Sequence, residues 1–179
     1  MPQAPLSKRA TPRTIVLVGL MGVGKTTIGR RLAARLRLPF VDADHEIEGA
    51  AGMTISEMFA AHGEAAFRDG ERRVIARLIE GEPKVLATGG GAFMHPDTRA
   101  LILDQAVAVW LDADLDVLAE RVGRRNDRPL LAGQDARAVL GTLAAVRNPI
   151  YGQAPIHIRS QPQPHEATVD AIVRALERA

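Results

Sequence analysis

Short hydrophobic runs alternate with longer amphipathic segments along most of this chain. The runs have the length and the aliphatic content of strands, and five of them stand out: 14–19, 39–44, 84–88, 106–111 and 155–158. Between them hydrophobic residues recur with helical spacing, which predicts helices at 25–37, 54–62, 65–80, 97–103, 114–122, 135–147 and 166–178. Thr54 and Glu57 have the spacing of a capping box at the start of one helix. The alternation predicts an α/β fold of three layers, a central five-stranded parallel sheet flanked by helices.

Two segments lie outside this alternation. Residues 1–13, MPQAPLSKRATPR, lack the hydrophobic run of a secretory signal, so we expect a flexible N-terminal tail in front of a single domain at 14–179. Residues 123–134, GRRNDRPLLAGQ, are polar and contain glycine between two predicted helices. We expect this stretch to form a mobile loop or lid.

The composition narrows the classes of partner. The chain carries 23 basic and 21 acidic residues, and only 3% of its residues are aromatic. These values give no dominant positive field and no row of stacking side chains, so we expect no nucleic-acid partner. No hydrophobic run approaches the roughly 18–20 residues that span a bilayer, so we expect no membrane partner. The chain has no cysteine, which excludes disulfides and thiol chemistry and fits a cytoplasmic protein.

The clearest motif is a glycine-rich turn between the first strand and the first helix. Residues 19–26, GLMGVGKT, fit the phosphate-binding pattern G-x-x-x-x-G-K-[ST] in that context. Glycines let backbone N–H groups close around phosphate oxygens, and the helix N-terminus adds its positive dipole end. Lys25 can reach the β- and γ-phosphates, and the Thr26 hydroxyl can bind Mg²⁺. The motif predicts a site for a nucleoside triphosphate with one magnesium ion.

A magnesium site beside this turn also needs a carboxylate, and two strand ends offer one. Asp42 and Asp44 close the run PFVDAD, whereas Asp112 closes VAVWLD. Side chains at i and i+2 of a strand point to one face. Asp42 and Asp44 would then face the ligand crevice together, one near the metal and one accepting a proton from a substrate hydroxyl. We favour this pair, because a solvated strand end or a helix N-cap explains Asp112 better. Thr88 ends the third strand, which leaves Asp42 as the acid on the metal side.

Three glycines and three arginines point to a second substrate. TGGGA at 88–92 exposes backbone N–H groups and allows close approach of a ligand, although a plain turn explains it equally well. Arg68, Arg128 and Arg147 occur in FRDGE, DRPLL and RNPIY. Each alone is typical of a surface cation. Together with a nucleotide site they favour a small anionic acceptor, because an arginine fork matches a carboxylate.

With these pieces the chain resembles the shikimate kinase family, P-loop proteins with a fold like that of nucleoside monophosphate kinases, from about residue 14 to 178. The matching segments are GLMGVGKTTIGRRLA, FVDADHEIE, FRDGE, ATGGGA, DRPLL and RNPIY, in the family's order. The resemblance implies MgATP-dependent phosphorylation of the 3-hydroxyl of shikimate, in the pathway to chorismate and aromatic amino acids. It also implies a small helical shikimate-binding region at about 44–72. We expect a monomer.

On the nucleotide side, the resemblance implies that the turn, the start of its helix and two later arginines bind ATP. These residues are Gly22, Val23, Gly24, Lys25, Thr26, Thr27, Arg121 and Arg128. Lys25 stabilises the transferring phosphoryl group, and Thr26 and Asp42 serve Mg²⁺ directly or through water. Arg121 stacks on one face of adenine. The other adenine face is left to one of three neighbours: Gln163, Pro164 or His165.

On the acceptor side, the resemblance implies a group of shikimate-binding residues: Asp44, Arg68, Gly89, Gly90, Gly91, Arg128 and Arg147. Asp44 binds the shikimate hydroxyls and is the candidate base. Arg68, Arg147 and the backbone at Gly90 hold the carboxylate. Arg128 closes over the reacting groups. Three further positions line or brace the pocket, although core packing explains the two aromatic ones nearly as well: Phe59, Phe67 and Glu71.

Two other classes of protein share the phosphate-binding turn. Another small-metabolite or nucleotide kinase, such as a gluconate kinase or a nucleoside monophosphate kinase, would give no reason for DAD, TGGGA and RPLL to occur together. A nucleotide switch would hydrolyse slowly without any response to an acceptor, and the guanine motif N-K-x-D of GTPases does not occur in the chain. We therefore favour a shikimate kinase over a related metabolite kinase, and either over a protein without catalytic activity.

Overall fold

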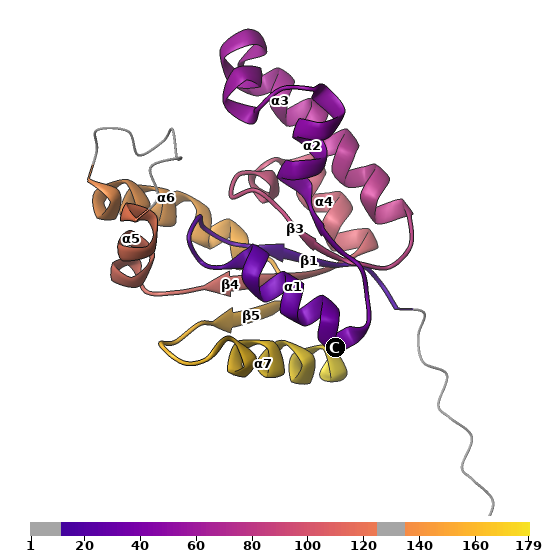
Figure 1. The fold of residues 1–179 in the computed structure, drawn as a ribbon, viewed down its shortest axis with the longest axis vertical. Helices are drawn as coiled ribbons and strands as arrows, with labels where there is room; N and C mark the ends of the chain where they lie inside the picture. The colour runs from indigo at the N-terminus through magenta and orange to yellow at the C-terminus, as the bar shows by residue number, and fades with distance from the viewer. Residues whose placement is uncertain (1–11, 125–134) are drawn as a thin grey trace, which may run out of the picture.

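A five-stranded parallel sheet forms the centre of the fold (Figure 1). The computed structural model describes residues 12–124 and 135–179. The strands lie in the order β2-β3-β1-β4-β5, and each neighbouring pair is parallel. Their bounds are β1 Ile15–Val18, β2 Phe40–Asp42, β3 Val85–Ala87, β4 Val107–Asp112 and β5 Ile156–Arg159. The central strand β1 is buried along its whole length, as expected for a strand that is covered on both faces. The predicted α/β class is confirmed.

Helices cover both faces of the sheet. Their bounds are α1 Lys25–Leu36, α2 Ala43–Ala51, α3 Ile55–Glu80, the short 3-10 helix η1 Ala92–Met94, α4 Pro96–Gln105, α5 Leu115–Gly123, α6 Ala136–Tyr151 and α7 His165–Arg178. Helices α1 and α7 pack against each other on one face (Figure 1). Because crossovers between parallel strands are right-handed, α3, α4 and α6 lie on the other face. None of the helices in the described ranges is long and apolar enough to cross a membrane.

The strand expected at 39–44 is shorter than its hydrophobic run. Strand β2 ends at Asp42, and α2 follows at once, a helix that the sequence pattern did not predict. The Asp42 carboxylate accepts a hydrogen bond from the backbone N–H of His45 at 3.2 Å, so Asp42 caps the helix. Asp44 therefore lies in the first turn of α2, and the expectation that it shares a strand face with Asp42 is wrong.

The helices expected at 54–62 and 65–80 are the two halves of α3, which bends at Gly63. Gly63 has a φ of 80° and a ψ of 170°, outside the helical region. The predicted capping box is confirmed. The Thr54 hydroxyl accepts a hydrogen bond from the Glu57 N–H at 3.2 Å, and the Glu57 carboxylate accepts one from the Thr54 N–H at 2.7 Å.

Helix α6 continues beyond its expected end at residue 147, through Pro149 to Tyr151. Proline removes one helical hydrogen bond, which is tolerated here because Pro149 is exposed and lies in the last turn. The extension places Arg147 and Tyr151 on one face of the helix, four residues apart.

The expected tail and lid fall largely outside the described residues. Of the tail at 1–13, only Pro12 and Arg13 are described, and Arg13 donates a hydrogen bond to the carbonyl oxygen of Asp104. Of the lid at 123–134, only the first two positions are described. Arg128 lies outside the described residues.

Candidate active site

The turn between β1 and α1 has the backbone that a phosphate-binding loop requires. Gly22 and Gly24 have φ angles of 82° and 96°, a region that glycine adopts without strain. Gly24 is also the N-cap of α1 and has no side chain to cap it. The first N–H groups of a helix have no partners within it, so they and the helix dipole favour an anion at this end. Val23 is buried within the turn, and Thr27 is exposed in the first turn of α1.

Lys25 and Thr26, the first two residues of α1, reach the loop and β2. The Lys25 ammonium donates to the carbonyl oxygens of Gly19 at 2.5 Å and Leu20 at 3.1 Å. The Thr26 hydroxyl donates to the Asp42 carboxylate at 3.1 Å. A hydroxyl and a carboxylate are hard oxygen donors of the kind that bind Mg²⁺. Within residues 12–124 and 135–179 no three His, Cys, Asp or Glu side chains gather as a metal cage. The Thr26 hydroxyl and the Asp42 carboxylate fit an ion that also takes ligands from phosphate and water.

Arg121 approaches the same loop from α5. Its guanidinium donates to the carbonyl oxygens of Gly22 at 3.3 Å and Val23 at 3.5 Å. Arg121 therefore stands beside the phosphate-binding turn, and its stacking on adenine stays a prediction. The candidates for the other adenine face are exposed at the start of α7: Gln163, Pro164 and His165.

Three side chains from different helices meet at the consecutive glycines 89–91, which follow β3. A β-carbon on the first, second or third glycine would lie 2.8 Å from Oδ1 of Asp44, 2.9 Å from Nη1 of Arg147 or 2.8 Å from Nη1 of Arg68, respectively. Real β-carbons essentially never come so close to another heavy atom. The three glycines thus leave room for one carboxylate and two guanidinium groups on a single stretch of backbone. This set of charges is suited to an acceptor that carries both a carboxylate and a hydroxyl.

Asp44 lies under opposing electrostatic influences. Burial raises the pKa of its carboxyl above the usual value, and the charge of Asp42 raises it further. The charges of Lys25 and Arg68 oppose that shift. A raised pKa makes a carboxylate a better general base near neutral pH. The carbonyl oxygen of Gly19, which accepts from Lys25, lies 3.7 Å from the position that a β-carbon would take on Gly90. The phosphate-binding turn and the glycines 89–91 therefore belong to one site.

Arg68 is oriented by a buried carboxylate and two aromatic rings. Its Nη1 donates to Oε1 of Glu71 at 2.9 Å, and the Glu71 side chain is only 2% exposed. The guanidinium carbon lies 5.1 Å from the ring centre of Phe67 and 6.0 Å from that of Phe59. Burial raises the pKa of Glu71, and the charge of Arg68 opposes the shift. Glu71 and the two rings therefore surround one of the two guanidinium groups.

Tyr151, which the sequence analysis did not identify, contacts the second guanidinium. Its hydroxyl donates a hydrogen bond to the carbonyl oxygen of Gly90. The Arg147 guanidinium lies beside the same glycine and opposes the rise in the pKa of the phenol. The spacing of Arg147 and Tyr151 within RNPIY could have indicated that they share a helix face. The contact to Gly90 spans 61 positions of the chain, and nothing local in the sequence points to it.

Asp112 takes part in a different cluster, at the carboxyl end of β4. Its carboxylate lies 3.2 Å from Nε2 of His157 and 3.3 Å from Nη1 of Arg159, both on β5, and its side chain is 11% exposed. The N-cap of α5 is Asp114. Both expectations for Asp112, a solvated strand end and a helix N-cap, are therefore wrong. Strands β3 and β1 separate it from Asp42 at the end of β2, and its contacts join β4 to β5.

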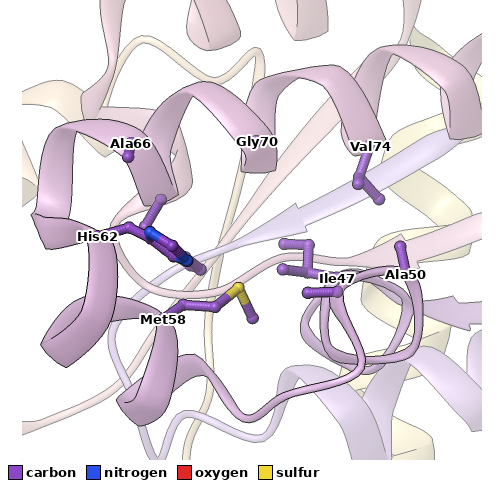
Figure 2. Close-up of a pocket in the computed structure, with 9 residues that line it drawn as sticks. Ile47, Ala50, Met58, His62, Ala66, Gly70 and Val74 are labelled. Carbon is purple, nitrogen blue, oxygen red and sulfur yellow. The ribbon is translucent and has the colours of Figure 1, made fainter.

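An apolar cavity of about 270 Å³ lies between α2 and α3. Figure 2 shows Ile47 of α2 opposite Met58, His62 and Val74 of α3 around it. The lining contains no Lys, Arg, Asp or Glu. The cavity therefore does not suit an anionic acceptor, in contrast to the cluster of charges at 89–91.

Comparison with known sequences identifies a family. The family model of shikimate kinase matches residues 21–177. A shikimate kinase of Zymomonas mobilis is 60% identical over 167 residues, which are 93% of this chain and 95% of that protein. A shikimate kinase of Novosphingobium aromaticivorans is 58% identical over 174 residues, which are 95% of this chain and 90% of that protein.

Solved structures agree with the sequence comparison. The structure of shikimate kinase from Acinetobacter baumannii in complex with shikimate has a TM-score of 0.89 and 35% identity, and the match covers 94% of each chain. A gluconokinase from Sinorhizobium meliloti has a TM-score of 0.64 and 20% identity, over 95% of this chain and 94% of that one. At that identity the likeness to the gluconokinase shows a shared fold alone. This chain belongs to the shikimate kinase family.

Proposed function

We propose that this chain transfers the γ-phosphoryl group of ATP, with Mg²⁺, to the 3-hydroxyl of shikimate and releases shikimate 3-phosphate and ADP. The observation that carries the proposal is the meeting of Asp44, Arg68 and Arg147 at residues 89–91, beside the phosphate-binding turn that holds Lys25. Family membership supports the same acceptor. The similar structure from Acinetobacter baumannii holds shikimate.

The acceptor would be oriented by its carboxylate. Arg68 and Arg147 offer two guanidinium forks, which match a carboxylate in charge and in geometry. The backbone of residues 89–91 closes one wall, since its lack of side chains lets a ligand approach closely. Asp44 lies at the opposite end of this glycine run from Arg68, where it would meet the hydroxyl groups of the acceptor.

Asp44 would accept the proton of the attacking hydroxyl. The bond between the 3-oxygen and the γ-phosphorus forms while the bond from that phosphorus to the β–γ bridging oxygen breaks, and ADP leaves with the electron pair. Lys25 stabilises the negative charge on the transferring group. Thr26 and Asp42 would hold Mg²⁺, directly or through water, and the bound ion would supply further neutralisation of phosphate charge.

The remaining residues of the site complete the proposal. The nucleotide would contact the turn and its neighbours: Gly22, Val23, Gly24, Thr27 and Arg121. Arg128 would close over the reacting groups with a lid at 123–134 and exclude water, which is a competing acceptor. The shikimate-binding region would be 44–72, within one domain at 14–179 that follows the tail 1–13. We propose a monomer, and the use of ATP fits the cytoplasm.

Release of ADP from ATP and Mg²⁺, measured with a panel of acceptors, tests the proposal. The panel contains shikimate, gluconate, a nucleoside monophosphate and no acceptor. Of the acceptors in the panel, only shikimate should support turnover. Lys25→Met should lower the rate of ADP release on the order of a hundredfold or more. Dependence on gluconate would instead assign the related metabolite kinase. A slow rate that no acceptor changes would indicate a nucleotide switch.

A further inference from the structure

The hydroxyl of Tyr151 occupies a fixed position between a helix and the glycine backbone. The side chain is completely buried at the end of α6. Its ring packs against Phe93 and Trp110, with ring centres 6.4 Å and 5.9 Å away. A fully buried ring that packs against two other rings keeps its hydroxyl in one place, so the position of that hydroxyl is well defined.

The two hydrogen bonds of this hydroxyl have fixed directions. Nη1 of Arg147 and the phenol oxygen lie 2.9 Å and 3.8 Å from one point, the position that a β-carbon would take on Gly90. A guanidinium has donors and no acceptor, so the contact between them runs from Arg147 to the phenol oxygen. The phenol proton is then left for the carbonyl oxygen of Gly90, to which it is donated. Burial raises the pKa of Tyr151 to about 12, against the influence of Arg147. The phenol consequently keeps its proton at every pH at which the enzyme would work.

Fixing the Gly90 carbonyl also fixes the next N–H group. In a planar trans peptide the carbonyl oxygen and the following N–H point in opposite directions. If the Gly90 carbonyl points to Tyr151, the Gly91 N–H points away from it. Tyr151 thereby sets the orientation of both the Arg147 guanidinium and the Gly91 N–H donor.

The two guanidinium groups of the site are held by different chemistry. Arg68 donates to the carboxylate of Glu71 at 2.9 Å, which neutralises part of its charge. Arg147 lies beside a neutral phenol. A phenol orients a guanidinium without opposing its charge, so this contact leaves the attraction of Arg147 for an anion undiminished.

We propose that Tyr151 is a positioning residue for the acceptor carboxylate, which acts by orienting Arg147 and the peptide between Gly90 and Gly91. This inference rests on the proposed function, since it assumes that Arg147 binds the carboxylate of shikimate. Tyr151 itself does not touch the reacting atoms in this account.

Tyr151→Phe removes the hydroxyl and keeps the ring. We expect KM for shikimate to rise roughly tenfold, the effect of losing one charge-assisted hydrogen bond, while kcat and KM for ATP change by less than about twofold. With an analogue whose carboxylate is replaced by a neutral carboxamide, the same substitution should change KM by less than about twofold, because the group that Arg147 recognises is missing. A purely structural role of Tyr151 would change both acceptors alike.

Trp110→Phe is the matched control. Trp110 packs against the same ring and belongs to none of the groups placed in the site. This variant should lower the melting temperature and leave KM for shikimate unchanged. If Tyr151→Phe instead keeps the wild-type KM for shikimate, or raises KM equally for both acceptors, the positioning role is wrong.

A second measurement covers the case in which Tyr151→Phe does not fold. Tyr151 is the single tyrosine of the chain, so biosynthetic 3-fluorotyrosine gives one ¹⁹F resonance at this site. Shikimate should shift that resonance more than the carboxamide analogue does, and equal or absent shifts at saturation would overturn the proposal. Wild-type turnover separates the two failures, because an enzyme that ignores shikimate refutes the proposed function, whereas one that uses it without involving Tyr151 refutes only this inference.

Discussion

The carboxylate of Asp44 lies directly against the backbone of Gly89, so that a β-carbon on Gly89 would stand 2.8 Å from Oδ1 of Asp44. This contact joins the first turn of α2 to the end of β3. Gly89→Ala should therefore displace Asp44 or the loop, and a displacement of about 1 Å can cost about a hundredfold in rate. We expect kcat/KM for shikimate to fall by about a hundredfold.

Gly49→Ala provides the control, since Gly49 lies in the same helix as Asp44 and a β-carbon there would meet no atom within 4 Å. Its turnover should match the wild type. Wild-type turnover in Gly89→Ala would argue against Asp44 acting from its position beside Gly89.

Asp44→Asn should abolish most turnover and stabilise the free protein at neutral pH. A carboxyl with a raised pKa binds its proton more tightly in the folded state. The resulting stabilisation is present below the ordinary aspartate pKa of about 4 and is lost as the pH rises through the raised value. Asparagine does not ionise, so it avoids this loss. The variant should melt above the wild type at pH 7, and the difference should shrink towards about pH 4. A lower melting temperature than wild type at pH 7 would contradict the electrostatic account of Asp44.

Asp112→Asn should affect stability and spare catalysis. Its partners, His157 and Arg159, are 46% and 55% exposed, so solvent screens these contacts and the loss should be roughly 0.5–1 kcal/mol. Urea unfolding measures that loss, and ADP release measures turnover. A variant with wild-type stability and little turnover would mean that Asp112, and not Asp42, serves the metal.

Two glycines of α3 should respond oppositely to alanine. A β-carbon at Gly63 or at Gly70 would meet no atom within 4 Å, so only backbone conformation distinguishes the two positions. Gly70 lies within the regular part of the helix, and Gly70→Ala should raise the free energy of unfolding by about 0.5–1 kcal/mol. Gly63 has a φ of 80° and a ψ of 170°, and Gly63→Ala should destabilise by about 1–3 kcal/mol. Equal changes in the urea midpoint would argue that α3 is not bent at Gly63.

The parts of the fold that could be predicted are those specified by neighbouring residues. Strand β1, the glycine turn and the start of α1 follow one another within 14–26, so pattern and motif agree there. Thr54 and Glu57 could be identified for the same reason, because a capping box lies within one turn. Helix α2 was missed because Asp42 is both the last residue of strand β2 and a helix cap, and strand periodicity alone cannot distinguish these roles.

The arrangement of the acceptor side could not be derived from local pattern. Asp44, Arg68 and Arg147 lie on three helices and meet only because β3 sits beside β1 with the glycines 89–91 at its end. The resemblance to the shikimate kinase family identified these residues, whereas their spacing in the sequence does not indicate that they meet in space. Tyr151 was not found by either route, since its contact to Gly90 depends on α6 extending past Pro149. The roles of these residues in binding and transfer stay predictions.

The most direct test of the central claim is the identity of the product. The chain is incubated with ATP, Mg²⁺ and shikimate, and the mixture is followed by ³¹P NMR with correlation to the protons of the shikimate ring. We predict one new phosphate monoester, formed in equal amount to ADP and coupled to the proton on carbon 3. Inorganic phosphate in place of the ester, or an ester coupled to another ring proton, would contradict the account.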